Sequence, residues 1–156
     1  MADSLEGTAL PQFTLESTEG KSISATDLRG SWTVLYFYPK DDTEGCTKEA
    51  CSFTASMGMF QKLNARVYGI SKDSVASHKK FIEKYGLKFP LLADPKGQLV
   101  RALGAGKNAK FLAALLGLPA RDTFLIDPQG QIVKVWRDVD PEQTVSVAYE
   151  EIKKRT

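Results

Sequence analysis

The chain has 156 residues, of which 42% are hydrophobic and 26% charged, and this ordinary globular composition excludes disordered and fibrous proteins. Lys and Arg number 21 against 19 Asp and Glu, without the basic block that would favour nucleic-acid binding. A chain of this length is most simply one domain, residues 1–156, around a single hydrophobic core.

Two segments bear on where the protein works. The longest apolar stretch, residues 111–120, is about half of the roughly 20 residues that a membrane span needs. The N-terminus, "MADSLEGTALPQF", lacks the basic and apolar regions of a secretory signal. We therefore expect a cytoplasmic protein, or the mature form of a protein of an organellar stroma. In such reducing compartments a lone cysteine pair is more often catalytic or redox-active than structural.

The N-terminal third predicts a hairpin, a strand and a helix, in that order. "FTLESTEGKSIS", residues 13–24, alternates weakly around a Glu-Gly pair and predicts a short β-hairpin. "WTVLYFYPK", residues 32–40, is a continuous apolar run, which is typical of a strand covered on both faces. Helical composition follows over about residues 46–63.

The middle of the chain predicts two further strands around a helix. "ARVYGIS", residues 65–71, has the pattern of a buried strand. The next helix, residues 74–86, can be capped by Ser71 or Asp73 and ends at a glycine. "FPLLAD", residues 89–94, predicts a third short strand.

The last third completes the fold class. Residues 97–105 and 109–117 are helical segments with glycine breaks, and residues 122–139 predict a hairpin with Pro and Gly in its turn. The final helix is expected from Asp140, its N-cap, to Arg155. This order predicts an α/β protein: a thioredoxin-like three-layer sandwich with a mixed central sheet and an added N-terminal β-hairpin.

Both cysteines lie in "PKDDTEGCTKEAC", where the predicted strand meets the predicted helix. Cys46 falls at the helix start, where free N–H groups and the helix dipole favour a thiolate. Nearby carboxylates oppose that effect, so a cation from elsewhere in the chain is expected. The acidic neighbours are Asp41, Asp42, Glu44 and Glu49.

The spacing of the cysteines excludes several chemistries. Four residues separate them, whereas a thioredoxin-type motif has two, and Ser52 occupies the position where a tyrosine-phosphatase loop has Arg. Two cysteines and the single His78 do not supply the four ligands of a zinc site. We therefore expect no metal site.

Helix geometry suggests a switch between two forms of this segment. Residues five apart in a helix have Cα atoms about 8.7 Å apart, whereas a disulfide needs a separation below about 7 Å. Cys46 and Cys51 can therefore join only if the helix unwinds, which predicts a reduced helical form and an oxidised, locally melted form.

The motif "PKDDTEGCTKEAC", together with "GISKDSVASHKKFIEKYGLKFPLLAD" and "RDTFLID", resembles the peroxiredoxins of the bacterioferritin comigratory protein or peroxiredoxin Q subfamily, of the atypical 2-Cys type. The resemblance implies an antioxidant thiol-dependent peroxidase that reduces hydrogen peroxide and organic hydroperoxides. It makes Cys46 the peroxidatic thiolate, which becomes a sulfenic acid. Cys51 would resolve that acid as an intramolecular disulfide, which thioredoxin or a related dithiol then reduces, so the resemblance implies an external thiol reductant and no bound cofactor.

The same resemblance implies roles for four further residues. Pro39 shields the pocket, and Thr43 hydrogen-bonds the peroxide. Arg121 is the expected cation, and Glu49 orients its guanidinium.

The chain departs from the pattern of the family that it resembles at two places outside the core motif, and these departures bear on the pocket rim and the peroxide preference. Relatives often carry Gly where this chain has Ala120, and His where it has Gln143 and Thr144. We interpret His78 as a helix-surface or packing residue. Trp32 and Trp136 are interpreted as packing residues.

Two other functions remain open from the residues alone. A non-enzymatic redox sensor or peroxide-triggered binding module would use the unwinding itself as its output. The second is a general disulfide oxidoreductase, although this chain lacks the cysteine spacing, with two intervening residues, that is usual for that class. Because a resolving thiol in the same helix needs no partner subunit, a monomer is expected.

Overall fold

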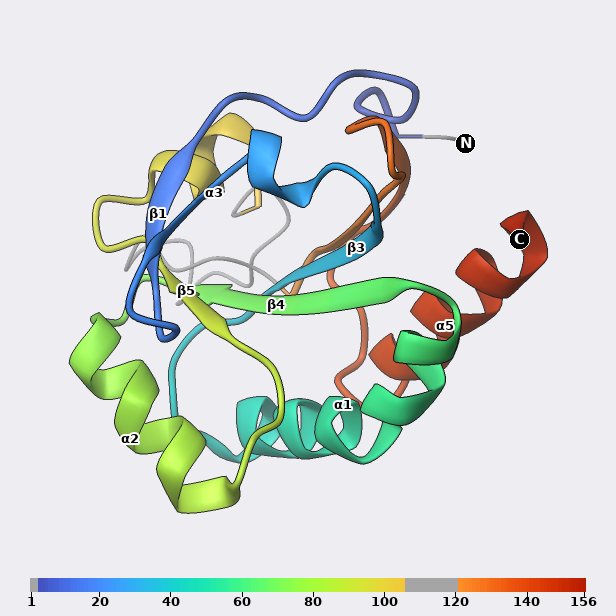
Figure 1. Ribbon diagram of the computed structural model, residues 1–156. Coiled ribbons are helices and arrows are strands. Elements are labelled where there is room, and N and C mark those ends of the chain that lie inside the picture. Colours follow the sequence, from blue (N-terminus) through green and yellow to red (C-terminus); the bar gives the residue numbers. More distant parts are fainter. Residues whose placement is uncertain (1–2, 106–120) are drawn as a thin grey trace.

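The computed structural model describes residues 3–105 and 121–156, and Figure 1 shows their arrangement. The predicted helix over residues 109–117 lies outside the described residues. The elements are β1 (Thr14–Ser17), β2 (Ser22–Ser24), the 3-10 helix η1 (Thr26–Leu28), β3 (Trp32–Phe37), α1 (Glu44–Lys62), β4 (Ala65–Ser71), α2 (Val75–Tyr85), β5 (Leu91–Ala93), α3 (Gln98–Ala102), β6 (Thr123–Ile126), β7 (Ile132–Trp136) and α5 (Thr144–Arg155).

One mixed sheet runs through the described part of the chain, in the order β2-β1-β5-β4-β3-β6-β7. β4 is parallel to both β3 and β5. The remaining pairs are antiparallel, including the N-terminal hairpin of β1 and β2. The predicted α/β class, the mixed sheet and the added hairpin are therefore confirmed.

The sheet separates two hydrophobic cores rather than the single core expected, because alternate residues of a strand point to opposite faces. From β3, Val34 and Tyr36 join the core that α1, α2 and α5 cover. Leu35 and Phe37 join the core on the other face, under α3 and the N-terminal segment. Figure 1 shows these helices on opposite sides of the sheet, which makes three layers.

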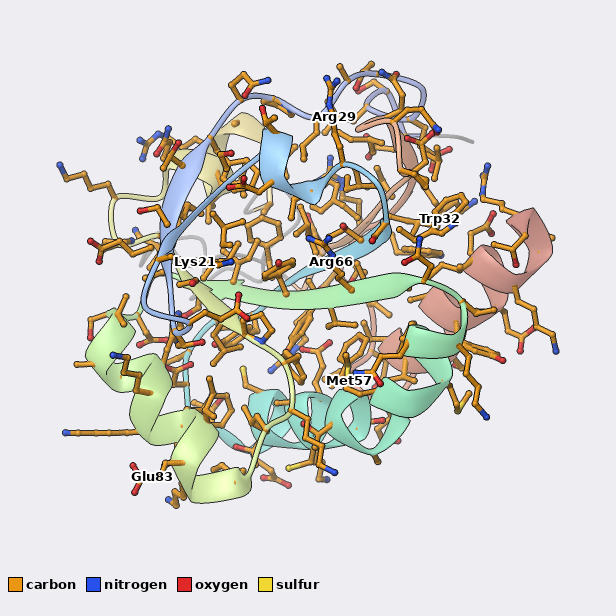
Figure 2. All side chains as sticks on the ribbon, in the orientation of Figure 1. Lys21, Arg29, Trp32, Met57, Arg66 and Glu83 are labelled. Carbon is orange, nitrogen blue, oxygen red and sulfur yellow. The ribbon has the colours of Figure 1, made fainter. Side chains whose placement is uncertain are left out.

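The side chains of the first core fill the space between α1 and the sheet. Figure 2 labels Met57, a buried residue of α1, within this layer. Trp32 and Trp136 are half-buried and pack against the same core. Their interpretation as packing residues is confirmed.

Glycines and turns end the elements where the sequence predicts. Gly86 ends α2 in the left-handed conformation, with φ of 63°. In the β6–β7 turn the N–H of Gly130 donates to the carbonyl of Asp127 at 3.0 Å. Both features confirm the expected stops.

Two expected helix caps are wrong. Ser74 caps α2, because its hydroxyl accepts the N–H of Ser77 at 3.1 Å. Ser71 and Asp73 instead hydrogen-bond to each other at 2.7 Å. The local pattern offers several capping residues in a row, and only the chain's path after β4 selects one.

The last helix begins later than expected. Residues 141–143 form a turn, and α5 starts at Thr144 rather than next to Asp140. The Asp140 carboxylate accepts the N–H of Glu142 at 2.9 Å and so organises this turn. Among the described helices, none combines the length and the apolarity that crossing a bilayer requires.

Candidate active site

Cys46 lies in the first turn of α1, directly after the loop that leaves β3. Its side chain is buried, with 1% of the residue exposed. Thr43 is the N-cap residue of the helix. The unpaired N–H groups of a helix start favour negative charge at this position.

Arg121 is the cation beside this sulfur, although it is far away in the sequence. Its Nη2 lies 3.3 Å from Cys46 Sγ, and its side chain is mostly buried. The sheet explains the contact: β6 pairs antiparallel with β3, and Thr123 faces Tyr36 near the end of that strand. The residues just before β6 therefore reach the start of α1.

Gly45 leaves the space that the guanidinium occupies. A Cβ atom at this position would lie 2.7 Å from Arg121 Nη2 and 3.3 Å from Arg121 Cζ. The guanidinium therefore packs directly on the backbone of the first turn of α1. The sequence does not predict this role, since a glycine before the cysteine carries no local signal for it.

Glu49 completes a chain of contacts to the sulfur. Its Oε1 accepts from Arg121 Nη1 at 3.3 Å, and its Oε2 accepts from the hydroxyl of Thr144 at 2.7 Å. Burial raises the pKa of this carboxyl from 4.5 to about 7, while the hydrogen bond from Thr144 and the charge of Arg121 act against that rise. The carboxyl is therefore a buried group that titrates close to neutral pH.

The other acidic neighbours of Cys46 have partners of their own. The Asp41 carboxylate accepts from the Tyr38 hydroxyl at 2.6 Å. Asp42 pairs with Lys84 at 2.7 Å, and Glu44 pairs with Lys48 at 3.5 Å. The expected opposition of these carboxylates to a thiolate is reduced accordingly.

Three more predicted site residues lie on the same strand–loop–helix segment. Pro39 is half-buried in the loop after β3. Thr43 is exposed, and its hydroxyl donates to the carbonyl of Lys40 at 3.0 Å. It is the N-cap residue by position, but its side chain makes no hydrogen bond to the backbone of α1. Cys51 is exposed on α1, and both cysteines are free thiols in one continuous helix.

His78 has a more specific position than the sequence predicts. It is fully buried, as a packing residue would be. Its Nδ1 lies 2.8 Å from Asp41 Oδ2, and its Nε2 lies 2.9 Å from the Leu92 carbonyl oxygen. His78 shares one helix face with Phe81, Ile82 and Tyr85, and this apolar spacing was the available signal for its burial.

His78, Asp41 and Asp73 bring potential ligand atoms within 4.8 Å of one another. Hydrogen bonds already engage these atoms: Asp73 Oδ2 accepts the N–H of Asp41 at 2.8 Å, and Asp41 Oδ2 accepts the hydroxyl of Ser77 at 2.8 Å. We assign this cluster to holding the loop before α1, and we assign no ion to it.

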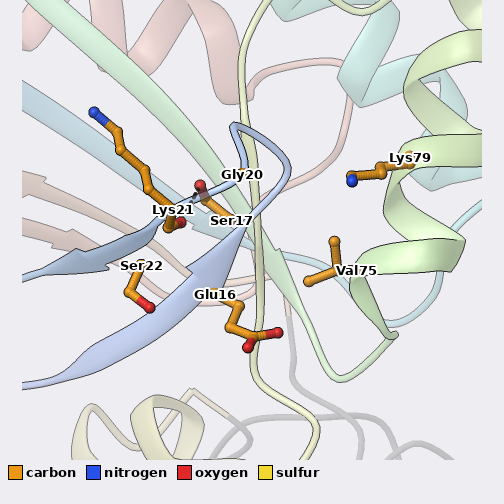
Figure 3. Close-up of a pocket in the computed structure, with 7 residues that line it drawn as sticks. All are labelled: Glu16, Ser17, Gly20, Lys21, Ser22, Val75 and Lys79. Carbon is orange, nitrogen blue, oxygen red and sulfur yellow. Dashed lines mark hydrogen bonds between the residues drawn. The ribbon is translucent and has the colours of Figure 1, made fainter.

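A pocket also lies away from the cysteines. Figure 3 shows it between the β1–β2 hairpin, with Lys21 and Glu16, and the start of α2, with Val75 and Lys79. Its volume is about 250 Å³. None of its lining residues belongs to the predicted site.

The sequence pattern of the AhpC/TSA family matches residues 7–135. This chain belongs to the AhpC/TSA family. It is similar to peroxiredoxin Bcp of Bacillus subtilis, with 40% identity over 94% of both chains. A putative peroxiredoxin bcp of Coxiella burnetii is 46% identical over 85% of this chain and 88% of its own length.

Solved peroxiredoxin structures share the fold. Peroxiredoxin Q of Xanthomonas campestris superimposes with a TM-score of 0.83 and 36% identity, covering 91% of this chain and 90% of that one. The fold is thus that of the thioredoxin-like peroxiredoxins, and the protein is a thiol-dependent peroxidase.

Proposed function

We propose that Cys46 is the peroxidatic residue and that Arg121 activates it. The observation that carries this proposal is the contact of 3.3 Å between Arg121 Nη2 and Cys46 Sγ. The thiolate attacks one oxygen of the peroxide, so that an S–O bond forms and the O–O bond breaks. The leaving oxygen takes up a proton and departs as water or an alcohol, and Cys46 becomes a sulfenic acid.

The neighbours of Cys46 position this reaction. The Arg121 guanidinium stabilises the negative charge as it moves from sulfur to the leaving oxygen. Glu49 holds the guanidinium in place. Thr43 Oγ1 donates to Lys40, which leaves its lone pairs to accept a hydrogen bond from the peroxide, and Pro39 limits access of water from the loop side.

We further propose that Cys51 resolves the sulfenic acid. Its thiol sulfur attacks Cys46 Sγ, a disulfide forms and water leaves. Both cysteines lie in the same continuous helix, and about 8.7 Å between their Cα atoms exceeds the reach of a disulfide. The first turns of α1 therefore unwind in this step.

The substrates and the reductant follow from this cycle. We propose that the enzyme accepts hydrogen peroxide and organic hydroperoxides, and one related Xanthomonas campestris structure is described with alkyl peroxide reduction activity. An external dithiol such as thioredoxin returns two electrons to the disulfide, without a bound cofactor. We place the enzyme in the cytoplasm or an organellar stroma, where such dithiols are kept reduced.

Peroxide reduction coupled to NADPH oxidation through thioredoxin and its reductase tests the cycle. We expect Cys46→Ser to abolish turnover, because the nucleophile is lost. Cys51→Ser should still consume one equivalent of peroxide but should not turn over with thioredoxin. Substantial activity of Cys46→Ser would refute the proposed nucleophile, and full turnover of Cys51→Ser would refute the proposed resolving role.

A further inference from the structure

A hydroxyl from α5 reaches the buried carboxylate of the active site. Thr144 is fully buried, and its Oγ1 lies 2.7 Å from Glu49 Oε2 but 3.3 Å from the carbonyl oxygen of Asp140. The single hydroxyl proton therefore points to the nearer, charged acceptor, because hydrogen bonds to carboxylates are the shorter and stronger ones.

The three contacts form a continuous line from α5 to the reactive sulfur. Thr144 donates to one oxygen of Glu49, Arg121 donates to the other, and Arg121 also contacts Cys46 Sγ. We propose that Thr144 is a positioning residue for the peroxidase reaction: through its hydrogen bond to Glu49 it secures the carboxylate that holds Arg121 on Cys46. This inference rests on the proposed roles of Cys46 and Arg121.

The environment of Glu49 explains why a second donor is needed. Only 1% of the residue is exposed, and burial without compensation favours the neutral acid. Among the contacts that lower the pKa of this carboxyl, the hydrogen bond from Thr144 is the largest, ahead of the charge and the hydrogen bond of Arg121. Without the hydroxyl, the pKa of Glu49 would be higher, so more of the carboxyl would be neutral near pH 7. A neutral carboxyl holds the guanidinium less strongly than a carboxylate does.

Within residues 3–105 and 121–156, the other groups that interact with Glu49 do not replace this donor. Cys46 on α1 and Tyr36 on β3 interact with the same cluster, and a negative charge on either would repel the carboxylate. The guanidinium of Arg121 already contacts both Glu49 and Cys46. Among the described contacts of Glu49, the hydroxyl of Thr144 is thus the uncharged one that favours the ionised form.

The test compares Thr144→Val, which removes the hydroxyl at nearly constant volume, with Thr144→Ser, which keeps it. The measured quantity is kcat/KM for hydrogen peroxide between pH 5 and pH 9. We expect Thr144→Val to move the acid limb of this profile upward by about one pH unit and to lower kcat/KM about tenfold on that limb. Thr144→Ser should retain the wild-type profile, and the variants should converge at pH 9.

A merely structural role would give a different result. In that case Thr144→Val would lower kcat/KM equally at all pH values, or would leave it unchanged, and either outcome overturns the inference. The double variant Glu49→Gln/Thr144→Val should lose no more activity than Glu49→Gln alone, because Thr144 acts through Glu49. A further loss in the double variant would contradict the proposed route.

A second readout is independent of turnover. Carbon-13 NMR of labelled glutamate, assigned with Glu49→Gln, follows the titration of the Glu49 carboxyl in the reduced enzyme. We expect its midpoint to rise in Thr144→Val and to stay near the wild-type value in Thr144→Ser. An unchanged midpoint in Thr144→Val would refute the inference even if Cys46 proves to be the nucleophile.

Discussion

At the scale of single residues, the site depends on how closely a cation approaches the start of α1. Arg121 contacts Cys46 Sγ at 3.3 Å, and it can do so because Gly45 has no side chain. Glu49 then holds the other nitrogen of the guanidinium. A missing Cβ atom and a buried carboxylate thus decide the position of the positive charge beside the sulfur.

Replacing Gly45 should change peroxide reduction and protein stability by different amounts. In Gly45→Ala the new Cβ would lie 2.7 Å from Arg121 Nη2, so we expect the guanidinium to be displaced and kcat/KM for peroxide to fall about tenfold or more. The free energy of unfolding should not fall in parallel, because Ala favours a helix over Gly by about 1 kcal/mol. Stopped-flow peroxide reduction and urea unfolding measure the two effects.

Gly58 provides the matched control for this variant. It lies on the exposed face of the same helix, and its Cβ would contact nothing within 4 Å. Gly58→Ala should stabilise the protein slightly and leave peroxide reduction unchanged. Equal kinetics of Gly45→Ala and Gly58→Ala would contradict the packing argument for Arg121.

The buried Glu49 carboxyl also predicts how stability changes with pH. Its folded-state pKa is raised from 4.5 to about 7, mainly by burial, so the folded protein binds this proton more tightly than the unfolded chain. The contribution of this group to the free energy of unfolding is therefore lost as the pH rises from 4.5 to about 7. The loss amounts to at most about 3 kcal/mol above pH 7.

Glu49→Gln isolates this contribution because its amide does not titrate. We expect the variant to be more stable than the wild type at pH 8 and of similar stability at pH 5, although its peroxidase activity should fall. Urea unfolding of both proteins at the two pH values gives the comparison. A difference in stability that does not depend on pH would count against the raised pKa.

At the scale of elements, α2 holds the loop that precedes the reactive helix. His78 Nδ1 and Asp41 Oδ2 form a hydrogen bond of 2.8 Å, and Lys84 Nζ donates to Asp42 Oδ2 at 2.7 Å. Asp42 has a positive φ of 60°, a conformation that costs energy for a side-chain-bearing residue. These contacts fix the loop after β3 on α2, whereas the proposed unwinding affects α1 beyond it.

The buried contact between His78 and Asp41 should contribute measurably to stability. In His78→Leu the Asp41 carboxylate would lose a buried partner, and we expect the free energy of unfolding to fall by about 1–3 kcal/mol. Lys79→Ala, at an exposed position of the same helix, is the control and should change it little. A loss as small as that of the control would mean that the contact does not hold the loop.

The proposed unwinding of α1 is visible in the helix content. Cys46 and Cys51 lie in one helix that runs from Glu44 to Lys62. Oxidation by one equivalent of peroxide should therefore lower the far-ultraviolet circular dichroism signal of helix, and Cys51→Ser should not show this loss. A spectrum that stays constant in the wild type would exclude unwinding as the step that joins the two cysteines.

At the scale of the whole molecule, the sheet brings the parts of the site together. β3 lies between β4 and β6 in the sheet. The C-terminal end of β3 leads into α1, and it also lies beside the start of β6, because Tyr36 pairs with Thr123. α5 then packs against α1 and adds the hydroxyl of Thr144. The tertiary structure therefore assembles the described site from segments that lie far apart in the sequence.

Because the proposed resolving thiol, Cys51, lies in the same helix as Cys46, resolution needs no partner subunit, and we expect the enzyme to work as a monomer. Light scattering of the reduced and the oxidised protein should give the mass of one chain in both states. Non-reducing electrophoresis after peroxide treatment should likewise show a single-chain band. A disulfide-linked dimer would contradict the intramolecular resolution proposed here.

The sequence by itself determined the features that depend on neighbours along the chain. Both hairpins, the strand before the reactive helix and the placing of Cys46 at a helix start follow from local apolar patterns and turn residues. The resemblance to peroxiredoxins also supplied Arg121 as the cation. Local rules were less reliable for helix starts, where several residues could serve as caps, and so the caps of α2 and α5 were wrong.

Only the tertiary structure decided which distant residues complete the site. Thr144 is 95 residues from Glu49, and His78 is 37 residues from Asp41. A threonine at a helix start or a histidine on a helix face has the same local pattern whether or not it meets a buried carboxylate. The order of the strands and the packing of α2 and α5 make these contacts, because burial and hydrogen bonding are properties of the folded core rather than of a short segment.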